Sequence, residues 1–262
     1  MDLGIQGRTA LIGGASSGIG LASARALAAE GVRVAIVARR EKDTGAAAAA
    51  ITRDFGVEAY PLAADLIEEG ACERVVDETI RHFGGLDIVV PNCGGPPKGH
   101  FPELSDQAWR EGFELTYLTT VRLIRAALPS MQKQTWGRIT TIGSVVVHEP
   151  RQELTLSSSI RTGLVALTRL LARQHGREGI NVNMVDPGYT LTARQIELAG
   201  GGKELSEKEI EQKFRNIAAE IPLGRLAQPE EIGNVVAFLC SERAAFVSGV
   251  SLLVDGAHTR GI

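Results

Sequence analysis

The stretch TALIGGASSGIGLASARALAAEG, residues 9–31, decides the fold class. Its first five residues, Thr9–Gly13, form the short apolar run that is typical of a buried strand. From Leu21 to Ala28 apolar residues recur at helical spacing, and Gly31 is a stop signal for that helix. The stretch therefore predicts a strand, a glycine-rich loop and a helix in immediate succession.

The loop between this strand and helix has the spacing Gly-x-x-x-Gly-x-Gly. Glycines let the backbone turn tightly and approach a pyrophosphate, while the first turn of a helix supplies free N–H groups and a partial positive charge. A glycine cluster alone can be merely a turn, but its place between strand and helix favours phosphate binding. Either serine of the loop can cap the helix. The candidate cofactor-binding residues here are Gly14, Ser16, Ser17, Gly18, Ile19 and Gly20.

The alternation of short Val/Ile/Leu-rich runs with helical stretches continues along the chain to about Val185. This pattern is typical of a parallel sheet covered by helices on both faces. We expect an α/β fold, a Rossmann-like doubly wound parallel sheet of about seven strands, in a single domain over residues 1–262. The expected strands are Thr9–Gly13, Val32–Val37, Val57–Leu62, Leu86–Val90, Arg138–Ile142, Ile180–Val185 and Ser251–Val254.

Helices are expected in the gaps between these strands. The alanine run Thr44–Thr52 is interpreted as a helix with a thin, closely packed face, and helical patterns also cover Ser105–Lys133 and Leu154–Gln174. Residues 190–222 break the alternation and contain a charged helix, Glu204–Glu220. An insertion of that kind after a strand end is a candidate substrate lid.

Composition excludes several classes of protein. The 262 residues are 44% hydrophobic and 23% charged, enough for a sizeable core, and the formal charge of −3 gives no field that would recruit nucleic acid or a membrane. Three scattered cysteines fit a reducing compartment, and neither a signal peptide nor a membrane span is apparent. We expect a cytoplasmic protein. The five histidines lie in no ligand spacing, so no metal site is expected.

Two arginines follow the second expected strand, where proteins of this fold class that bind NAD place an acid on the ribose diol. Arg39 and Arg40 suit a 2′-phosphate and would not replace that carboxylate. The sequence thus favours NADP over NAD. The alternative is a solvated basic pair at the start of a helix.

Over nearly its whole length the chain resembles the short-chain dehydrogenase/reductase family. The likeness depends on motifs in order: the cofactor loop, Asp65, Pro91-Asn92-Cys93-Gly94, Leu128-Pro129-x-Met131, Ser144, Gly179-Ile180-Asn181-Val182-Asn183, Pro187-Gly188 leading to Thr192, and Val254-Asp255-Gly256. The resemblance implies that Asp65, with Leu66, binds adenine, that Asn92 and Gly94 support the cofactor, and that the segment after the sixth strand lies beside the nicotinamide. That segment contributes Pro187, Gly188, Thr190 and Thr192. Asp65 could instead cap a helix, and Asn92 could lie in a turn.

The chain departs from the family at the positions that carry its chemistry. The family uses a Ser, a Tyr and a Lys four residues after the Tyr; here Ser144 fits the first role, but Ser157 and Arg161 replace the other two. The supporting Asn is replaced by Thr116. A Ser hydroxyl is a poor proton donor and Arg stays protonated, so neither can relay protons as Tyr and Lys do. Arg161 can still bind ribose oxygens of the cofactor and place positive charge near the nicotinamide. Losing a positioned acid costs about 100- to 10,000-fold in rate.

Two residues could supply the proton instead. His148 lies four residues after Ser144, and a histidine is a competent acid near neutral pH. Tyr189 follows the Pro-Gly turn and could reach the nicotinamide. The alternatives are a solvated loop histidine and a tyrosine packed against the lid.

The expected activity is that of an atypical NADP-dependent oxidoreductase that reduces a carbonyl or imine, similar to a 3-oxoacyl reductase, on a small to medium substrate. A protonated imine would need less acid catalysis. A catalytically silent NADP(H)-binding pseudoenzyme or sensor is the alternative. A cofactor-independent lyase is a further alternative. Halohydrin dehalogenases share this fold and carry Arg at the position of the family's Lys, but, unlike this chain, they keep the catalytic Tyr and lose the cofactor-binding glycines. The resemblance implies a homo-oligomer, a tetramer or dimer.

Overall fold

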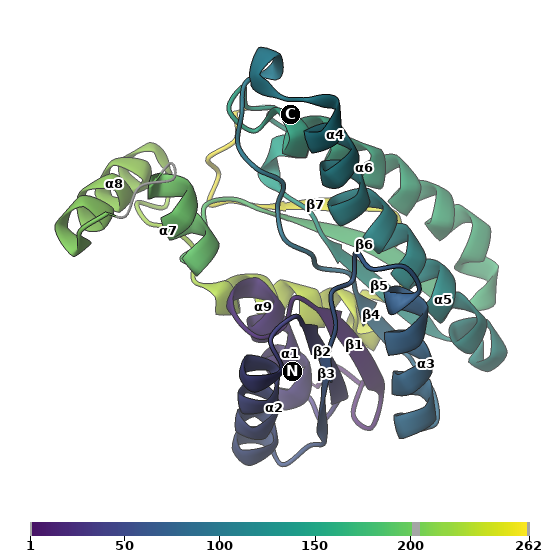
Figure 1. Ribbon diagram of the computed structural model, residues 1–262. Helices are drawn as coiled ribbons and strands as arrows, with labels where there is room; N and C mark the ends of the chain where they lie inside the picture. The colour runs from purple at the N-terminus through teal and green to yellow at the C-terminus, as the bar shows by residue number, and fades with distance from the viewer. Residues whose placement is uncertain (1, 201–204, 261–262) are drawn as a thin grey trace.

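A seven-stranded, wholly parallel sheet forms the centre of the molecule in the computed structural model, which describes residues 2–200 and 205–260 (Figure 1). The strand order is β3-β2-β1-β4-β5-β6-β7, so the direction in which strands are added reverses between β1 and β4. The predicted doubly wound fold is confirmed, and each strand lies within about two residues of its predicted place. The strands are β1 Thr9–Gly13, β2 Arg33–Ala38, β3 Ala59–Ala63, β4 Ile88–Val90, β5 Gly137–Ile142, β6 Ile180–Pro187 and β7 Ser251–Val254.

Helices cover both faces of this sheet (Figure 1). One face packs against α1 Gly18–Ala29, α2 Glu41–Phe55 and α9 Pro229–Leu239, and the other against α3 Ala71–Phe83, α5 Thr119–Gln134 and α6 Thr155–His175. The alanine run lies inside α2, where Ala47, Ala48 and Ile51 are buried, as the closely packed face predicts. No described helix is both long and apolar enough to cross a membrane.

The helical pattern predicted over Ser105–Lys133 is interrupted in the structure. It divides into α4 Asp106–Phe113 and α5, joined by a π-helical turn over Glu114–Leu118. A π-turn adds one residue per turn without breaking the run of helical residues, so apolar periodicity does not reveal it. The turn carries Thr116, the residue in the family's Asn position.

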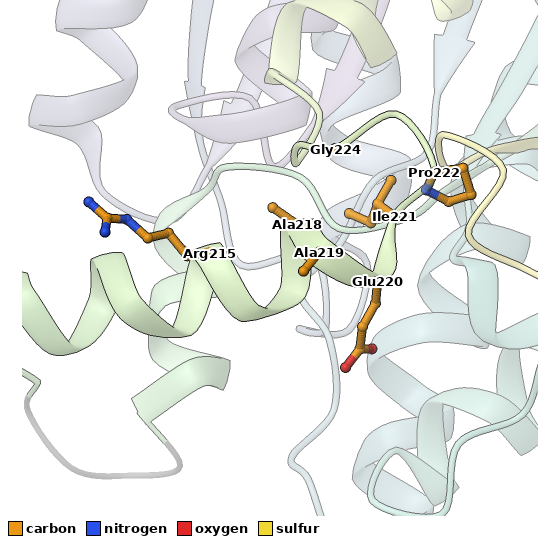
Figure 2. A pocket seen from close by; sticks show the side chains of 7 residues that line it. All are labelled: Arg215, Ala218, Ala219, Glu220, Ile221, Pro222 and Gly224. Carbon is orange, nitrogen blue, oxygen red and sulfur yellow. The ribbon is translucent and has the colours of Figure 1, made fainter.

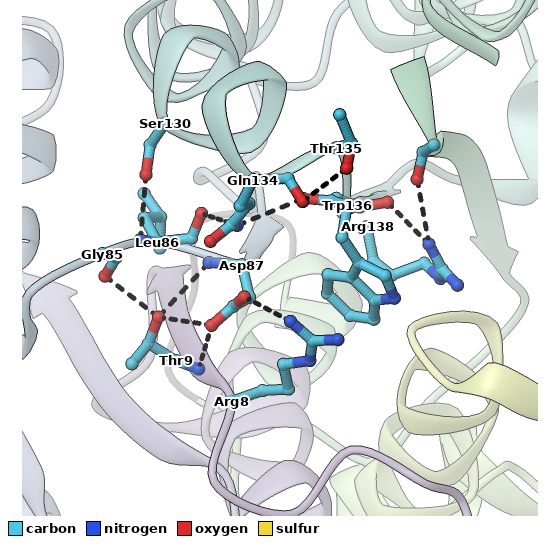
Figure 3. A network of polar contacts seen from close by, with 12 residues as sticks. Arg8, Thr9, Gly85, Leu86, Asp87, Ser130, Gln134, Thr135, Trp136 and Arg138 are labelled. Carbon is cyan, nitrogen blue, oxygen red and sulfur yellow. Dashed lines mark hydrogen bonds and ion pairs between the residues drawn. The ribbon is translucent and has the colours of Figure 1, made fainter. Parts of the chain in front are cut away.

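A polar network ties together the amino ends of the central strands (Figure 3). The Asp87 carboxylate, just before β4, accepts hydrogen bonds from the Thr9 main-chain N–H at 2.8 Å and from the Arg8 guanidinium at 3.0 Å. Arg138 of β5 is 3% exposed, stacks on Trp136 at 4.3 Å and donates to Glu242. These contacts stabilise the sheet at the amino ends of its strands. The loops that could form a binding site lie at the opposite end, where the strands finish.

Two helices project from the body after β6, namely α7 Ala193–Gly200 and α8 Glu207–Glu220 (Figure 1). The carboxyl end of α7 is held by lysines: Lys98 donates to the Leu198 carbonyl at 2.6 Å, and Lys213 to the Ala199 carbonyl at 2.6 Å. Arg194 donates to the Pro96 carbonyl at 2.9 Å. The insertion is thereby attached to the loop that follows β4.

The start of α9 offers a test of stability against pH. Arg225 pairs with both carboxylate oxygens of Glu231 at 2.6 and 2.7 Å, and this lowers the pKa of Glu231 to about 2. Glu231 also accepts from the Gln228 main-chain N–H at 2.8 Å. Since its side chain is 42% exposed, we expect Glu231→Gln to cost about 0.5–1 kcal/mol at pH 7.

The sign follows from the lowered pKa. The ionised Glu231 stabilises the fold fully above its unfolded value near 4.5, and this contribution is lost as pH falls towards about 2. Thermal melts should therefore show wild type above Glu231→Gln at pH 7, with the difference disappearing at pH 2–3. Equal melting temperatures at pH 7 would contradict the assignment.

Candidate active site

The glycine loop lies at the reversal point of the sheet, where ligands bind in doubly wound folds. It joins β1 to α1, with Gly14 and Gly18 both at φ +56°. Asn92, just after β4, donates from Nδ2 to the Gly13 carbonyl at 3.0 Å. The ends of two neighbouring strands thus support one loop.

The shape of this loop fits a bound pyrophosphate. A Cβ added at Gly13 would lie 2.5 Å from the Asn92 carbonyl oxygen, and one at Gly20 would lie 2.3 Å from that of Gly14. Ser17 occupies the N-cap position of α1 but makes no capping hydrogen bond, contrary to what its residue type suggests. Because no side chain of the described residues caps it, the first turn of α1 offers its N–H groups to an anion.

Arg39 and Arg40 are both exposed after β2, the strand next to β1. Arg40 forms an ion pair with Asp43 in the first turn of α2. Within the described residues Arg39 has no ion-pair partner. Arg39 is therefore the better placed of the two to meet a phosphate.

Asp65 and Leu66 follow β3 in the same row of strand ends. The Asp65 carboxylate accepts from the Ile67 main-chain N–H at 3.3 Å, a local turn, and α3 begins only at Ala71. Asp65 therefore does not cap that helix. Leu66 is buried, and its carbonyl accepts from the Cys72 thiol at 3.3 Å.

The segment after β6 leads back to the glycine loop. A Cβ at Gly188 would lie 2.6 Å from the Asp255 Cβ, so a larger residue does not fit there. Thr190 is buried and donates to the Gly188 carbonyl at 3.2 Å. The Cγ2 atom of Thr192 is 3.3 Å from the place where a Cβ of Gly18 would be. The predicted cofactor residues of these two segments are thus brought together.

Ser144 and Ser157 lie at the end of β5 and in the first turn of α6. Ser144 Oγ accepts a long hydrogen bond, 3.5 Å, from the Val146 main-chain N–H. Ser157 is half-buried and makes no side-chain hydrogen bond within the described residues. Both hydroxyls have remaining capacity for a substrate oxygen.

Arg161 is buried, with 6% exposure. Its guanidinium donates to the Ile142 carbonyl at 3.2 Å and to the Gly94 carbonyl at 3.4 Å. No carboxylate pairs with Arg161 among the described residues. A positive charge is thus held between the ends of β4 and β5.

Thr116 is fully buried in the π-turn, and its hydroxyl donates to the Gly112 carbonyl at 2.6 Å. The hydroxyl is thereby bound to its own helix. Thr116 therefore packs between α4 and α5, and its hydroxyl proton is not offered to the site.

The Tyr189 side chain contacts Arg151, which precedes α6, and His258 of the carboxyl-terminal segment. Arg151 donates to its hydroxyl at 2.5 Å and lies over its ring at 4.7 Å, and the His258 ring stands edge-on to it at 5.4 Å. These three residues line a polar cavity of about 290 Å³ together with Glu149, Glu153, Glu220 and Arg260. The hydrogen bond from Arg151 holds the Tyr189 hydroxyl in the wall of this cavity.

His148 lies close to Ser144 and has a partner that sequence reasoning missed. Its Nε2 is 2.8 Å from Oδ2 of Asp186, which is fully buried near the end of β6. The Asp186 Oδ1 accepts from the Ser144 main-chain N–H at 3.2 Å. The available signal was an acid near the end of a strand that is buried along almost its whole length.

A larger cavity, about 680 Å³, opens where α8 returns to the body (Figure 2). It is lined by Arg215, Ala218, Ala219, Glu220, Ile221, Pro222 and Gly224. None of these residues belongs to the glycine loop or to the strand ends that hold Asn92 and Ser144. The cavity belongs to the base of the insertion.

Comparisons with known proteins agree with the fold. Residues 14–259 match the family described as enoyl-(acyl carrier protein) reductase. The chain is 33% identical over 256 residues to the 3-oxoacyl-(acyl-carrier-protein) reductase FabG of Aquifex aeolicus, covering 98% of this chain and 99% of that one. It is 36% identical over 256 residues to a cis-4-hydroxycyclohexanecarboxylate dehydrogenase of Sinomonas cyclohexanicum, covering 96% of each.

Solved structures give the same result. The L-sorbose reductase of Gluconobacter frateurii, solved with NADPH and L-sorbose, superimposes with a TM-score of 0.95 at 33% identity over 100% of both chains. The parallel sheet, the glycine loop at its reversal point and these matches along nearly the whole chain have one explanation. The protein is a member of the short-chain dehydrogenase/reductase family of oxidoreductases.

Proposed function

We propose that the protein is an NADPH-dependent reductase of a carbonyl or imine group on a small to medium-sized substrate. The observation that carries this proposal is the glycine loop packed against Asn92 at the reversal point, together with Arg39, which lies at the end of the neighbouring strand β2 and has no ion-pair partner among the described residues. The relatives support it, since they include 3-oxoacyl and sorbose reductases, the latter solved with NADPH.

The residues divide into a cofactor set and a substrate set. In the proposal the glycine loop and the first turn of α1 bind the pyrophosphate, Arg39 binds the 2′-phosphate, and Asp65 contacts adenine. NADPH held there would supply a hydride to the substrate carbon, and the product would need one proton on its oxygen or nitrogen. Ser144 and Ser157 orient that atom by hydrogen bonds, and Arg161 places positive charge beside Gly94.

Residues 190–222, of which 201–204 lie outside the described residues, act as the lid in this proposal. They begin at the exit of β6, and α7 is attached to the loop after β4 through Arg194 and Lys98. A homo-oligomer is compatible with the exposed apolar side chains of Leu252 on β7, Phe238 on α9 and Phe246 in the segment between them.

Fluorescence titration of the purified protein with NADPH and NADH tests the proposal, followed by a panel of aldehydes, ketones and imines monitored at the nicotinamide absorbance. We expect tighter binding of NADPH than of NADH, and oxidation of NADPH with at least one carbonyl or imine class. Binding without turnover across the panel would favour the catalytically silent NADP(H)-binding protein. Absence of binding would overturn the proposed function.

A further inference from the structure

The Asp186 carboxyl group is fully buried beside the strand end that carries Ser144. Carboxylates are almost never fully buried unless they are paired. Here Oδ1 accepts from the Ser144 main-chain N–H at 3.2 Å, Oδ2 lies 2.8 Å from His148 Nε2, and the Ser251 hydroxyl also donates to Oδ2. Segments from β5, β6 and β7 therefore meet on one carboxyl group.

The surrounding structure leaves room for this carboxyl group. A Cβ added at Gly143 would lie 2.1 Å from the Asp186 Oδ1 atom and 2.1 Å from Cε of Met184. Burial raises the pKa of Asp186, while the hydrogen bonds from Ser251 and His148 act in the opposite direction. A buried acid whose pKa is raised costs folding stability at neutral pH, because its ionised form is disfavoured inside the protein. Packing alone does not account for an acid at this position.

His148 is held rigidly with respect to Ser144. One 3₁₀ turn, Val145–Val147, separates them, and the His148 main-chain N–H donates to the Val145 carbonyl at 3.0 Å. The ring keeps 30% of its surface exposed. Asp186 holds Nε2, and within the described chain no residue hydrogen-bonds Nδ1. The free nitrogen of the ring is thus available to a substrate or a water.

We propose that Asp186 is a positioning residue that holds His148 as the proton donor of the reduction, in the role left open by Ser157. This inference rests on the proposed function. In the step, the O–H bond of the product forms as the Nδ1–H bond of the His148 imidazolium breaks. The neutral imidazole keeps its Nε2–H bond and its hydrogen bond to Asp186, and a second proton, taken from solvent at the partly exposed ring, restores Nδ1–H for the next turnover.

The test uses purified full-length protein with NADPH and the best carbonyl substrate of the panel. We expect His148→Ala to lower kcat by about 100- to 10,000-fold, as loss of a positioned acid does, and added imidazole to restore part of the activity. Asp186→Asn keeps the size of the side chain but removes its charge, and should lower kcat by about 10- to 100-fold, as loss of an orienting partner does. Both variants should bind NADPH with affinities within about threefold of wild type, because neither residue belongs to the glycine loop or to the arginines after β2.

Two further comparisons separate this role from a structural one. In the double variant, Asp186→Asn should cause no further loss of kcat beyond His148→Ala, because the two residues act as one unit. His175→Ala is the matched control, since His175 also pairs with a carboxylate, Glu178 at 2.8 Å, but at the carboxyl end of α6. It should keep the wild-type kcat and show no response to imidazole.

Wild-type kcat in His148→Ala, or failure of imidazole to restore its activity, would overturn the inference while leaving the proposed function intact. Additive losses in the double variant would also overturn it. Should Asp186→Asn fail to fold, His148→Ala decides the matter, because its ring is partly exposed. A wild-type protein that oxidises no NADPH with any substrate would overturn the proposed function, and this inference with it.

Discussion

Arg39→Ala should weaken NADPH binding by about 10- to 100-fold while changing NADH affinity by less than about threefold. A guanidinium bonded to a phosphate contributes about 1.5–3 kcal/mol, and NADH lacks the 2′-phosphate that would receive it. Arg39 follows β2 and has no ion-pair partner among the described residues. The ratio of the two dissociation constants, measured by fluorescence titration, should therefore fall by one to two orders of magnitude.

Arg173→Ala is a matched control for this experiment. Arg173 is an exposed arginine in the last turn of α6, which lies at the amino edge of the sheet because α6 runs antiparallel to the strands. Its removal should leave both dissociation constants unchanged. Equal weakening of NADPH and NADH by Arg39→Ala would contradict recognition of the 2′-phosphate and favour a general electrostatic effect.

Gly233→Ala should destabilise the fold by about 2–3 kcal/mol and lower the melting temperature by about 4–12 °C. Gly233 lies in α9 where this helix packs against α1, and an added Cβ would be 2.6 Å from the Ala22 carbonyl oxygen and 3.0 Å from the Ser23 nitrogen. Main-chain atoms of a buried helix cannot move aside singly, so the two helices must separate. Because α1 carries the glycine loop, NADPH affinity should also fall.

Gly45→Ala is the opposite case on the same layer of helices. Gly45 lies inside α2, and an added Cβ there would meet no atom within 4 Å. Alanine stabilises a helix interior by about 1 kcal/mol over glycine, so the melting temperature should rise by about 2–4 °C. Calorimetry of the two variants decides the matter: a stable Gly233→Ala would show that α1 and α9 are not closely packed in solution.

The strands and the glycine loop could be predicted because their signals are local. A buried parallel strand needs a short apolar run, and a tight turn beside a helix needs glycine, so Thr9–Gly13 and Gly14–Gly20 are legible in the sequence. The π-turn at Glu114–Leu118 was not predicted, because it shifts the helical phase without interrupting the apolar pattern.

Long-range polar contacts were beyond sequence reasoning for a different reason. The three donors to Asp186 lie 42, 38 and 65 residues away along the chain, and nothing in their spacing indicates that they converge. Arg161 is a similar case. Its position indicated a charge near the nicotinamide, but its acceptors are main-chain carbonyls, which every sequence has and no motif marks.

The polar network around Asp87 and Arg138 has a consequence for how this fold tolerates change. It secures the strands at their amino ends, on the edge opposite to Ser144, Ser157 and Arg161. Rigidity and chemistry therefore depend on separate sets of side chains. In such a fold, Tyr and Ser at position 157, or Lys and Arg at position 161, can replace one another without loss of the contacts that stabilise the sheet. The reaction can therefore change through substitutions at the carboxyl ends of the strands alone.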